Sequence, residues 1–386
     1  MKKKTVFRLV LASLFAALVA SSVAQAQTPL STGRAALSQH TPEALEAAHQ
    51  AFKGGLVTTP NDADLNFFYA ATLLAREAHT ADFKQQFTSI NATIVNPSIY
   101  ALEYAFPLGS TGVFQPAAGV STDTQFAYLN TRASIISEAL ECLDKITDGN
   151  FTVNLTSAET SLLDTKVDYA DICLLRAGLH LSKAALHLGN SYNLSGEYKK
   201  FYDLYAAGNL TPQAVLSGFP QLFNLSTTPS QRLDAGTQIK SALAEWNKAL
   251  AAIKTKRPLS EGSVLGPIGE SDTTPFLFAF DSIAAAEEVG AQFNTLVSSL
   301  SAQATFPANK DFALEGQKIN LSNLVTSPSG LRSLAPTRFD RGFFRPSSWP
   351  DVTLGGIFPG ATQDDMNDAG NLLFVLQPTV YPKFGS

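Results

Sequence analysis

A row of polar side chains on one predicted helix is the feature of this sequence best suited to contacting a ligand. Its members recur at alternating spacings of four and three residues, and they are Tyr169, Cys173, Arg176, His180, Lys183, His187 and Asn190. This spacing places all of them on one helix face. Arg176, His180 and Lys183 are therefore candidate binding residues for a polar or anionic ligand. The solvent-exposed face of an amphipathic helix has the same spacing of polar residues, and we expect this polar row to face solvent.

The two histidines of the polar row do not have the spacing of a metal site. His180 and His187 lie about 10.5 Å apart along a helix axis, whereas two metal ligands on one helix usually occupy positions i and i+4. Neither histidine has a carboxylate within one turn. We predict no metal and no cofactor.

Motifs that carry catalysis are missing as well. The sequence has no H-E-x-x-H pair, phosphate-binding loop, G-x-S-x-G turn or dinucleotide fingerprint. We therefore name no catalytic residue and favour a role without catalysis. Two carboxylates that meet only in the folded chain could still serve a glycoside hydrolase, so an enzyme acting on polysaccharide stays an alternative.

Aromatic residues supply a further candidate. Trp349 lies in a Phe- and Pro-rich stretch, and a second aromatic group, which follows the polar row, comprises Tyr192, Tyr198, Phe201, Tyr202 and Tyr205. Aromatic faces suit sugar rings and peptide side chains, so Trp349 is a candidate ligand contact. Core filling beneath a wrapping loop explains these aromatics too, and we favour that interpretation.

Helical periodicity dominates the chain from residue 41 to residue 302 and predicts an all-α protein. Thr41, Pro42 and Glu43 are typical of a helix start, and Gly54-Gly55 is expected to stop that helix. Thr122 and Gln125 predict a capping box for another helix, which Gly149 ends. The most apolar helix, over 167–188, has an apolar arc broad enough to pack on two sides, so we place it at the centre of the core.

The region after residue 302 has a different character. Eight prolines interrupt short apolar pieces between residues 307 and 382, which predicts turns and extended segments. One short helix is expected over 363–371. We therefore divide the chain into a helical domain over 27–302 and a Pro-rich, mostly irregular segment over 303–386 that packs on it.

Residues 41–78 resemble a tetratricopeptide unit. Ala48, Phe52, Gly55 and Pro60 reproduce the small–aromatic–small–proline spacing of that family, and Ala70 occupies its small position on the second helix. The resemblance implies stacked helical hairpins that bind peptides or partner proteins. No period of about 34 residues runs through the chain, so an irregular bundle or solenoid is expected rather than a regular array.

Residues 170–190 also resemble one helix of the SusD-like glycan-binding proteins. The resemblance rests on Leu174-Leu175-Arg176-Ala177, followed by Leu181 and Gly189. It implies capture of a glycan by an exported, mostly helical protein. This chain lacks the N-terminal lipid-anchor cysteine of those proteins, so we keep SusD-like glycan binding as an alternative.

Residues 1–26 have the order of a bacterial export signal. Four basic residues precede an apolar run, and Ala24-Gln25-Ala26 forms a cleavage site. The run is too short for a membrane span, so we expect cleavage and release into the periplasm or the medium, with no transmembrane span left.

Charge after the signal argues against nucleic acid as a partner. Four of the 28 basic residues and none of the 33 acidic residues lie in residues 1–26, which leaves 24 basic residues and a net charge of −9. Cys142 and Cys173 both fall on predicted helices, and the sequence leaves open whether they are bridged.

These observations favour an exported, non-catalytic binding or scaffold protein. Its partner is predicted to be a protein, a peptide or a glycan.

Overall fold

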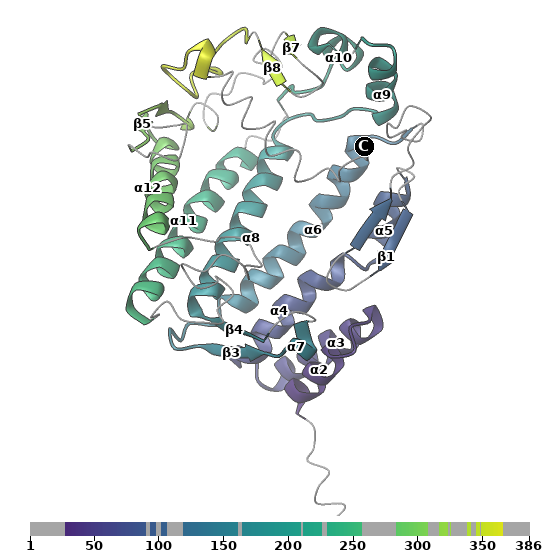
Figure 1. Ribbon diagram of the computed structural model, residues 1–386, viewed down its shortest axis with the longest axis vertical. Coiled ribbons are helices and arrows are strands. Elements are labelled where there is room, and N and C mark those ends of the chain that lie inside the picture. Colours follow the sequence, from purple (N-terminus) through teal and green to yellow (C-terminus); the bar gives the residue numbers. More distant parts are fainter. Residues whose placement is uncertain are drawn as a thin grey trace, which may run out of the picture.

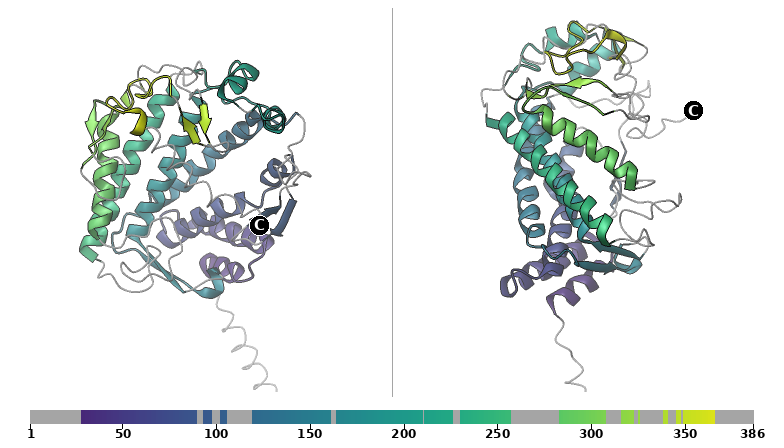
Figure 2. Two further views of the ribbon diagram at one scale, coloured as in Figure 1. Left: turned by 45° about the horizontal axis from the view of Figure 1, so that its top comes forward. Right: turned by 90° about the vertical axis from the view of Figure 1, so that its left-hand side faces the viewer.

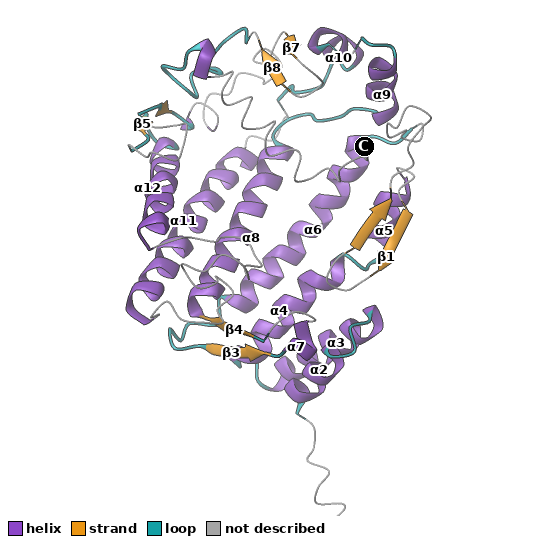
Figure 3. Ribbon diagram, in the orientation of Figure 1, coloured by secondary structure: helices purple, strands orange, loops and turns teal. Residues whose placement is uncertain are grey.

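The computed structural model describes residues 28–89, 93–97, 102–105, 119–160, 164–209, 211–225, 230–256, 283–307, 316–322, 325, 338–340, 345–347 and 349–365. Over these residues the protein is mostly helical, as the periodicity predicts (Figure 3). The predicted signal segment lies outside the described residues. None of the helices in the described part combines the length and apolar content that a membrane span requires.

The helices are α2 (Pro29–Leu37), α3 (Pro42–Thr58), α4 (Ala63–Glu77), α5 (Ala81–Ser89), α6 (Thr122–Leu143), α7 (Ser157–Thr160), α8 (Tyr169–Asn190), α9 (Tyr198–Ala206), α10 (Pro212–Gly218), α11 (Ser230–Lys256) and α12 (Ile283–Ser299). Short antiparallel pairs join β1 (Thr93–Pro97) to β2 (Leu102–Ala105), β3 (Thr152–Leu155) to β4 (Thr165–Asp168), β5 (Ala304–Thr305) to β6 (Lys318–Ile319), and β7 (Arg338–Asp340) to β8 (Arg345–Ser347).

Seven of the described helices form a series in which each member packs on the next member. Contacts run from α2 to α3, α3 to α4, α4 to α6, α6 to α8, α8 to α11 and α11 to α12 (Figures 1 and 2). The most extensive of these contacts joins α8 to α11. Helix α8 therefore packs on two sides, as its broad apolar arc predicts.

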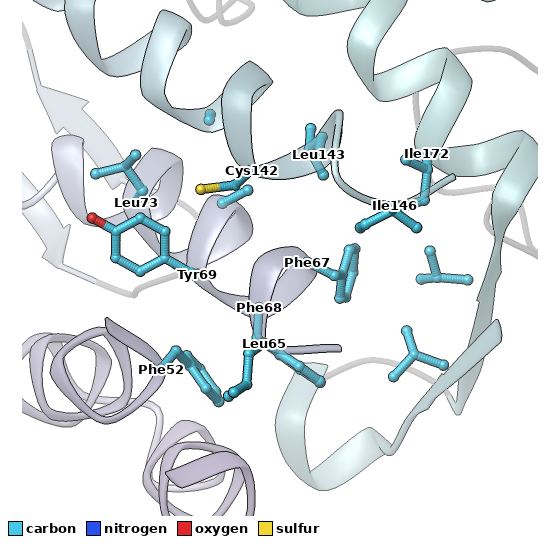
Figure 4. Packing of buried hydrophobic residues seen from close by; sticks show 14 of the residues in the cluster. Phe52, Leu65, Phe67, Phe68, Tyr69, Leu73, Cys142, Leu143, Ile146 and Ile172 are labelled. Atoms are coloured by element: carbon cyan, nitrogen blue, oxygen red, sulfur yellow. The ribbon is translucent and has the colours of Figure 1, made fainter. Parts of the chain in front are cut away.

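Helices α3 and α4 form the first tightly packed pair. Thr41 and Asp62 cap their N-termini through side-chain oxygens. Phe52 of α3 is fully buried and stacks on Phe68 of α4 with ring centroids 5.0 Å apart (Figure 4). The expected stop at Gly54-Gly55 is wrong, because α3 continues to Thr58. At Gly55 a Cβ atom would lie 2.8 Å from Leu65, so this glycine allows close approach of α4 rather than ending the helix.

The main core cluster lies between α4, α6 and α8. Phe67, Leu143, Ile146 and Ile172 meet there, each at most 7% exposed (Figure 4). Helix α6 ends at Leu143, so Gly149 does not end it as expected, and the chain then returns into the core at Ile146. The end of α6 is therefore fixed by tertiary packing rather than by a glycine cap.

Asp168 sets the start of α8 with a complete capping box. Its carboxylate accepts from the backbone N–H groups of Ala170 and Asp171, while the Asp171 side chain accepts from the Asp168 N–H. This cap follows β4 without a break, so the β3–β4 hairpin sets the direction in which α8 begins.

After α12 the described residues form only short strands, turns and isolated helical positions. Gln363–Asp365 are helical, and the rest of the short helix predicted there lies outside the described residues. Cys142 and Cys173 are both buried free thiols.

Candidate functional site

The polar row of α8 faces helix α11, and the prediction that it faces solvent is wrong. The Nδ1 atom of His187 lies 2.6 Å from Gln231 Oε1, and the Nδ1 atom of His180 lies 2.7 Å from Gln238 Oε1. One helical turn further along α8, Arg176 Nη1 lies 3.3 Å from Glu245 Oε2. The partners on α11, which are Gln231, Gln238 and Glu245, recur every seven residues. That heptad spacing is the signal in the sequence that would have revealed the pairing.

Arg176 is a structural residue rather than a ligand contact. Its side chain is 3% exposed. Its guanidinium donates to the backbone carbonyls of Leu143 and Ile146, the latter at 2.8 Å, and its Nε lies 3.3 Å from Asp144 Oδ1. Together with Glu245, these contacts tie the end of α6 to both α8 and α11. A ligand in solvent cannot reach this group.

The other sequence candidates do not form a site with Arg176. His180 and Lys183 are half-buried on the same row. Trp349 is half-buried, and its indole nitrogen is buried without a hydrogen-bond partner in the part of the chain that the structure describes. None of the four candidates lines the cleft that lies beyond the end of α8.

That cleft has a volume of about 510 Å³ and lies between the start of α6, the end of α8 and two loops. We call it the amide cleft because carboxamides dominate its polar lining. Its lining residues are Asp123, Ala127, Asn130, Gly189, Asn190, Tyr192, Asn193, Leu194, Gln221, Asn224 and Leu225. The start of α6 and the end of α8, which supply part of this lining, are the upper ends of the two helices in Figure 1.

Hydrogen bonds hold several of these carboxamides in fixed orientations. Asn130 and Asn190 pair reciprocally, each Nδ2 donating to the other Oδ1, at 2.7 and 2.6 Å. Asn224 Nδ2 donates to Gln221 Oε1 at 3.0 Å. Each carboxamide has two N–H donors and an oxygen acceptor, so every pair retains unused groups for a ligand.

The first loop of the amide cleft, 191–196, is tied to the start of α6. Thr122 donates its hydroxyl to the Leu194 carbonyl, and the same hydroxyl oxygen accepts from Gly196 N at 2.9 Å. The predicted capping box at Thr122 is therefore wrong. Ser121 is the N-cap residue and has no side-chain cap bond, while Thr122 already belongs to the helix and bonds the loop.

The second loop, 219–225, is bonded to the first. Asn193 N donates to Asn224 O at 2.7 Å, and Phe223 N donates to Asn193 O at 2.6 Å. Phe223 has φ of 65°, a left-handed conformation that is costly for a bulky side chain. The paired loops thus form a wall whose strained turn is held by backbone hydrogen bonds.

Sequence reasoning missed this cleft because its carboxamides come from five separate positions with no common spacing. The only local signal is the density of Asn and Gln around 190–193 and 221–224. Metal binding is not indicated either, since the described residues contain no group of three or more His, Cys, Asp or Glu side chains that could hold an ion.

Comparison of the sequence with models of protein families gives no match, and searches of curated proteins and of solved structures give none either.

Proposed function

We propose that this chain is an exported, non-catalytic binding protein whose amide cleft takes a hydroxyl-rich ligand, with an oligosaccharide as the favoured class. The observation that carries the proposal is the lining of the cleft by five carboxamide side chains. A sugar hydroxyl both donates and accepts hydrogen bonds, and a carboxamide offers both functions on one rigid plane. The volume of the cleft falls within the range of about 300–1,000 Å³ that is typical of small-molecule sites.

The charge of the lining favours binding without cleavage. Glycoside hydrolases use two carboxyl groups on opposite sides of the scissile bond, at separations of about 5–10 Å. Asp123 is the one carboxylate among the residues that line the amide cleft, and it accepts a hydrogen bond from the Ser195 hydroxyl. The alternative of a polysaccharide-acting hydrolase would therefore require a second carboxylate from elsewhere.

The architecture that we propose is an irregular solenoid of helical hairpins with a tetratricopeptide-like first pair. Its support is the serial packing of α2, α3, α4, α6, α8, α11 and α12, each on its neighbour in the chain. The small and aromatic positions behind the resemblance, Ala48, Phe52 and Ala70, are fully buried at the α3–α4 contact. Scaffold binding of a protein partner is the alternative function that this architecture supports.

A glycan array followed by titration calorimetry tests the proposal. The test variant replaces both Asn130 and Asn190 by Ala, which removes the reciprocal pair without leaving either amide unpaired. The matched control is Asn247→Ala on the exposed side of α11. We expect at least one oligosaccharide to bind, about tenfold more weakly to the double variant and equally to the control.

Other outcomes would contradict the proposal in different ways. Glycan binding that the double variant leaves unchanged would place the site elsewhere. Release of shorter sugars from the bound glycan would establish an enzyme. Absence of any glycan binding would favour the protein partner.

A further inference from the structure

Arg232, in the first turn of α11, is buried without a carboxylate partner among the described residues. It is 8% exposed, and its Nε donates to the Val325 carbonyl at a long 3.4 Å. Arg176, the other arginine that is buried in the described structure, is compensated by Asp144 and Glu245, and even the partly exposed Arg34 lies 2.5 Å from Glu159. A buried guanidinium without an anion is costly, and the described residues supply no negative group to this one.

The surrounding sequence does not supply that negative group. Segments 226–229 and 323–337, which flank the two bonded residues Arg232 and Val325 in the chain, contain no Asp or Glu. The nearest acid on α11 is the exposed Asp234. It follows Arg232 by two positions, which points it about 200° away around the helix.

A buried hydroxyl without a hydrogen-bond partner lies beside the same helix end. Tyr192 lines the amide cleft, is 8% exposed, and its hydroxyl has no hydrogen-bond partner in the described structure. Burial raises the pKa of the Tyr192 phenol, and the charge of Arg232 acts in the opposite direction, so the guanidinium is within electrostatic reach. His187 lies shortly before Tyr192 in the sequence, and Gln231 directly precedes Arg232. The hydrogen bond between His187 and Gln231 holds the end of α8 against the start of α11.

We propose that Arg232 and Tyr192 form an anion subsite at the inner edge of the amide cleft, which takes the carboxylate of an acidic sugar. A guanidinium binds a carboxylate through two parallel N–H donors, and the Tyr192 hydroxyl can add a third donor. The N-terminus of α11 contributes a favourable dipole. This inference rests on the proposed function, because the amide cleft would hold the rest of the sugar chain.

The test compares two trisaccharides with the same sugar backbone, one with free carboxylates and one with methyl esters in their place. Trigalacturonate carries three carboxylates, and its fully methyl-esterified form has the same backbone and linkage without them. Acetate, which is a carboxylate without a sugar, is the third probe. Calorimetry measures binding of the sugars, and thermal unfolding measures stabilisation by each probe at constant ionic strength.

The wild-type protein is expected to bind trigalacturonate about tenfold more tightly than its methyl ester. Arg232→Gln should abolish this preference and leave binding of the ester unchanged, while Arg232→Lys should retain part of it. Tyr192→Phe should reduce the preference. Lys240→Gln, an exposed cation two turns further along α11, is the matched control and should behave as the wild type. Acetate should raise the melting temperature of the wild type and not of Arg232→Gln.

Two results separate failure of the subsite from failure of the proposed function. Equal binding of the acid and the ester, or equal loss of both in Arg232→Gln, would overturn the anion subsite and leave the sugar cleft standing. Stabilisation by acetate that depends on Arg232, with neither sugar bound, would support the subsite and contradict the proposed ligand class. Lack of both acetate stabilisation and charge preference would overturn the subsite. If Arg232→Gln melts at a much lower temperature, Arg232→Lys and Tyr192→Phe carry the comparison.

Discussion

Mild acid should destabilise this protein through one buried histidine. His49 of α3 is 1% exposed and stacks on Tyr69 of α4 with ring centroids 4.6 Å apart. Its Nδ1 lies 3.2 Å from Thr72 Oγ1, whose own proton is donated to the Phe68 carbonyl at 2.7 Å. The histidine therefore donates from Nδ1 to the threonine.

The size of the effect follows from the pKa of this ring. Burial, aided by the positive charge of Arg76, lowers the pKa of His49 from 6.5 to about 4. A folded-state pKa below the unfolded value means that the stabilisation is complete above about pH 6.5 and is lost as the pH falls toward 4. Between pH 7 and pH 5 the unfolded chain gains a proton that the folded protein does not, which lowers the free energy of unfolding by about 2 kcal/mol.

Urea unfolding of the wild type and of His49→Gln at pH 7, 6 and 5 measures this quantity. Glutamine cannot titrate, so the variant should lose about 2 kcal/mol less than the wild type over this range, although it is less stable at pH 7. Burial raises the pKa of Glu159, but hydrogen bonds from Arg34 and Thr156 outweigh it and lower that pKa. Such a carboxylate therefore stays ionised in the folded protein between pH 7 and pH 5. Parallel pH profiles for the two proteins would refute the reasoning.

Four further substitutions probe the packing and the cleft. Arg176→Met should cost about 3 kcal/mol in urea unfolding, because Glu245 loses a buried partner; a cost below about 0.5 kcal/mol would mean that the residue is solvated after all. Gly55→Ala should cost about 1–3 kcal/mol through the close contact with α4, whereas Gly54→Ala, where a Cβ atom meets nothing within 4 Å, should be neutral or stabilising. Thr122→Val should cost about 1–2 kcal/mol and weaken glycan binding, since the loop over the cleft loses its bonds to α6; unaltered affinity would show that this tie does not shape the site.

Local signals predicted much of the helical structure. The caps at Thr41 and the periodicity over 167–188 place α3 and α8 within a few residues of where they lie. Glycine was the less dependable signal, because Gly55 lies inside α3, where it admits a side chain of the next helix. A glycine can end a helix or allow close packing inside one, and only the position of the neighbouring helix distinguishes the two roles.

The candidate site could not be predicted because its interactions join residues that are distant in sequence. The two wrong predictions, for the polar row of α8 and for Thr122, both concern such partners. The polar row of α8 matches a solvated face in every local respect, and only its register against α11 shows that His180 and Arg176 have partners 58 and 69 positions away. Thr122 has the right type for a cap, yet its hydroxyl bonds a loop 72 residues further on. The amide cleft leaves only a local density of Asn and Gln in the sequence, since the fold alone brings Asn130 to Asn190.

The pairs between α8 and α11 restrict how those two helices can slide. Two helices joined only by aliphatic side chains can exchange one set of contacts for a similar set one turn away, a shift of about 5.4 Å. Here such a shift would separate His187 from Gln231, His180 from Gln238 and Arg176 from Glu245 at the same time, so a buried cation would lose its buried carboxylate. It would also carry Arg232 past Tyr192. These three pairs do not line the amide cleft, yet they set the distance between the two residues that we propose bind the carboxylate.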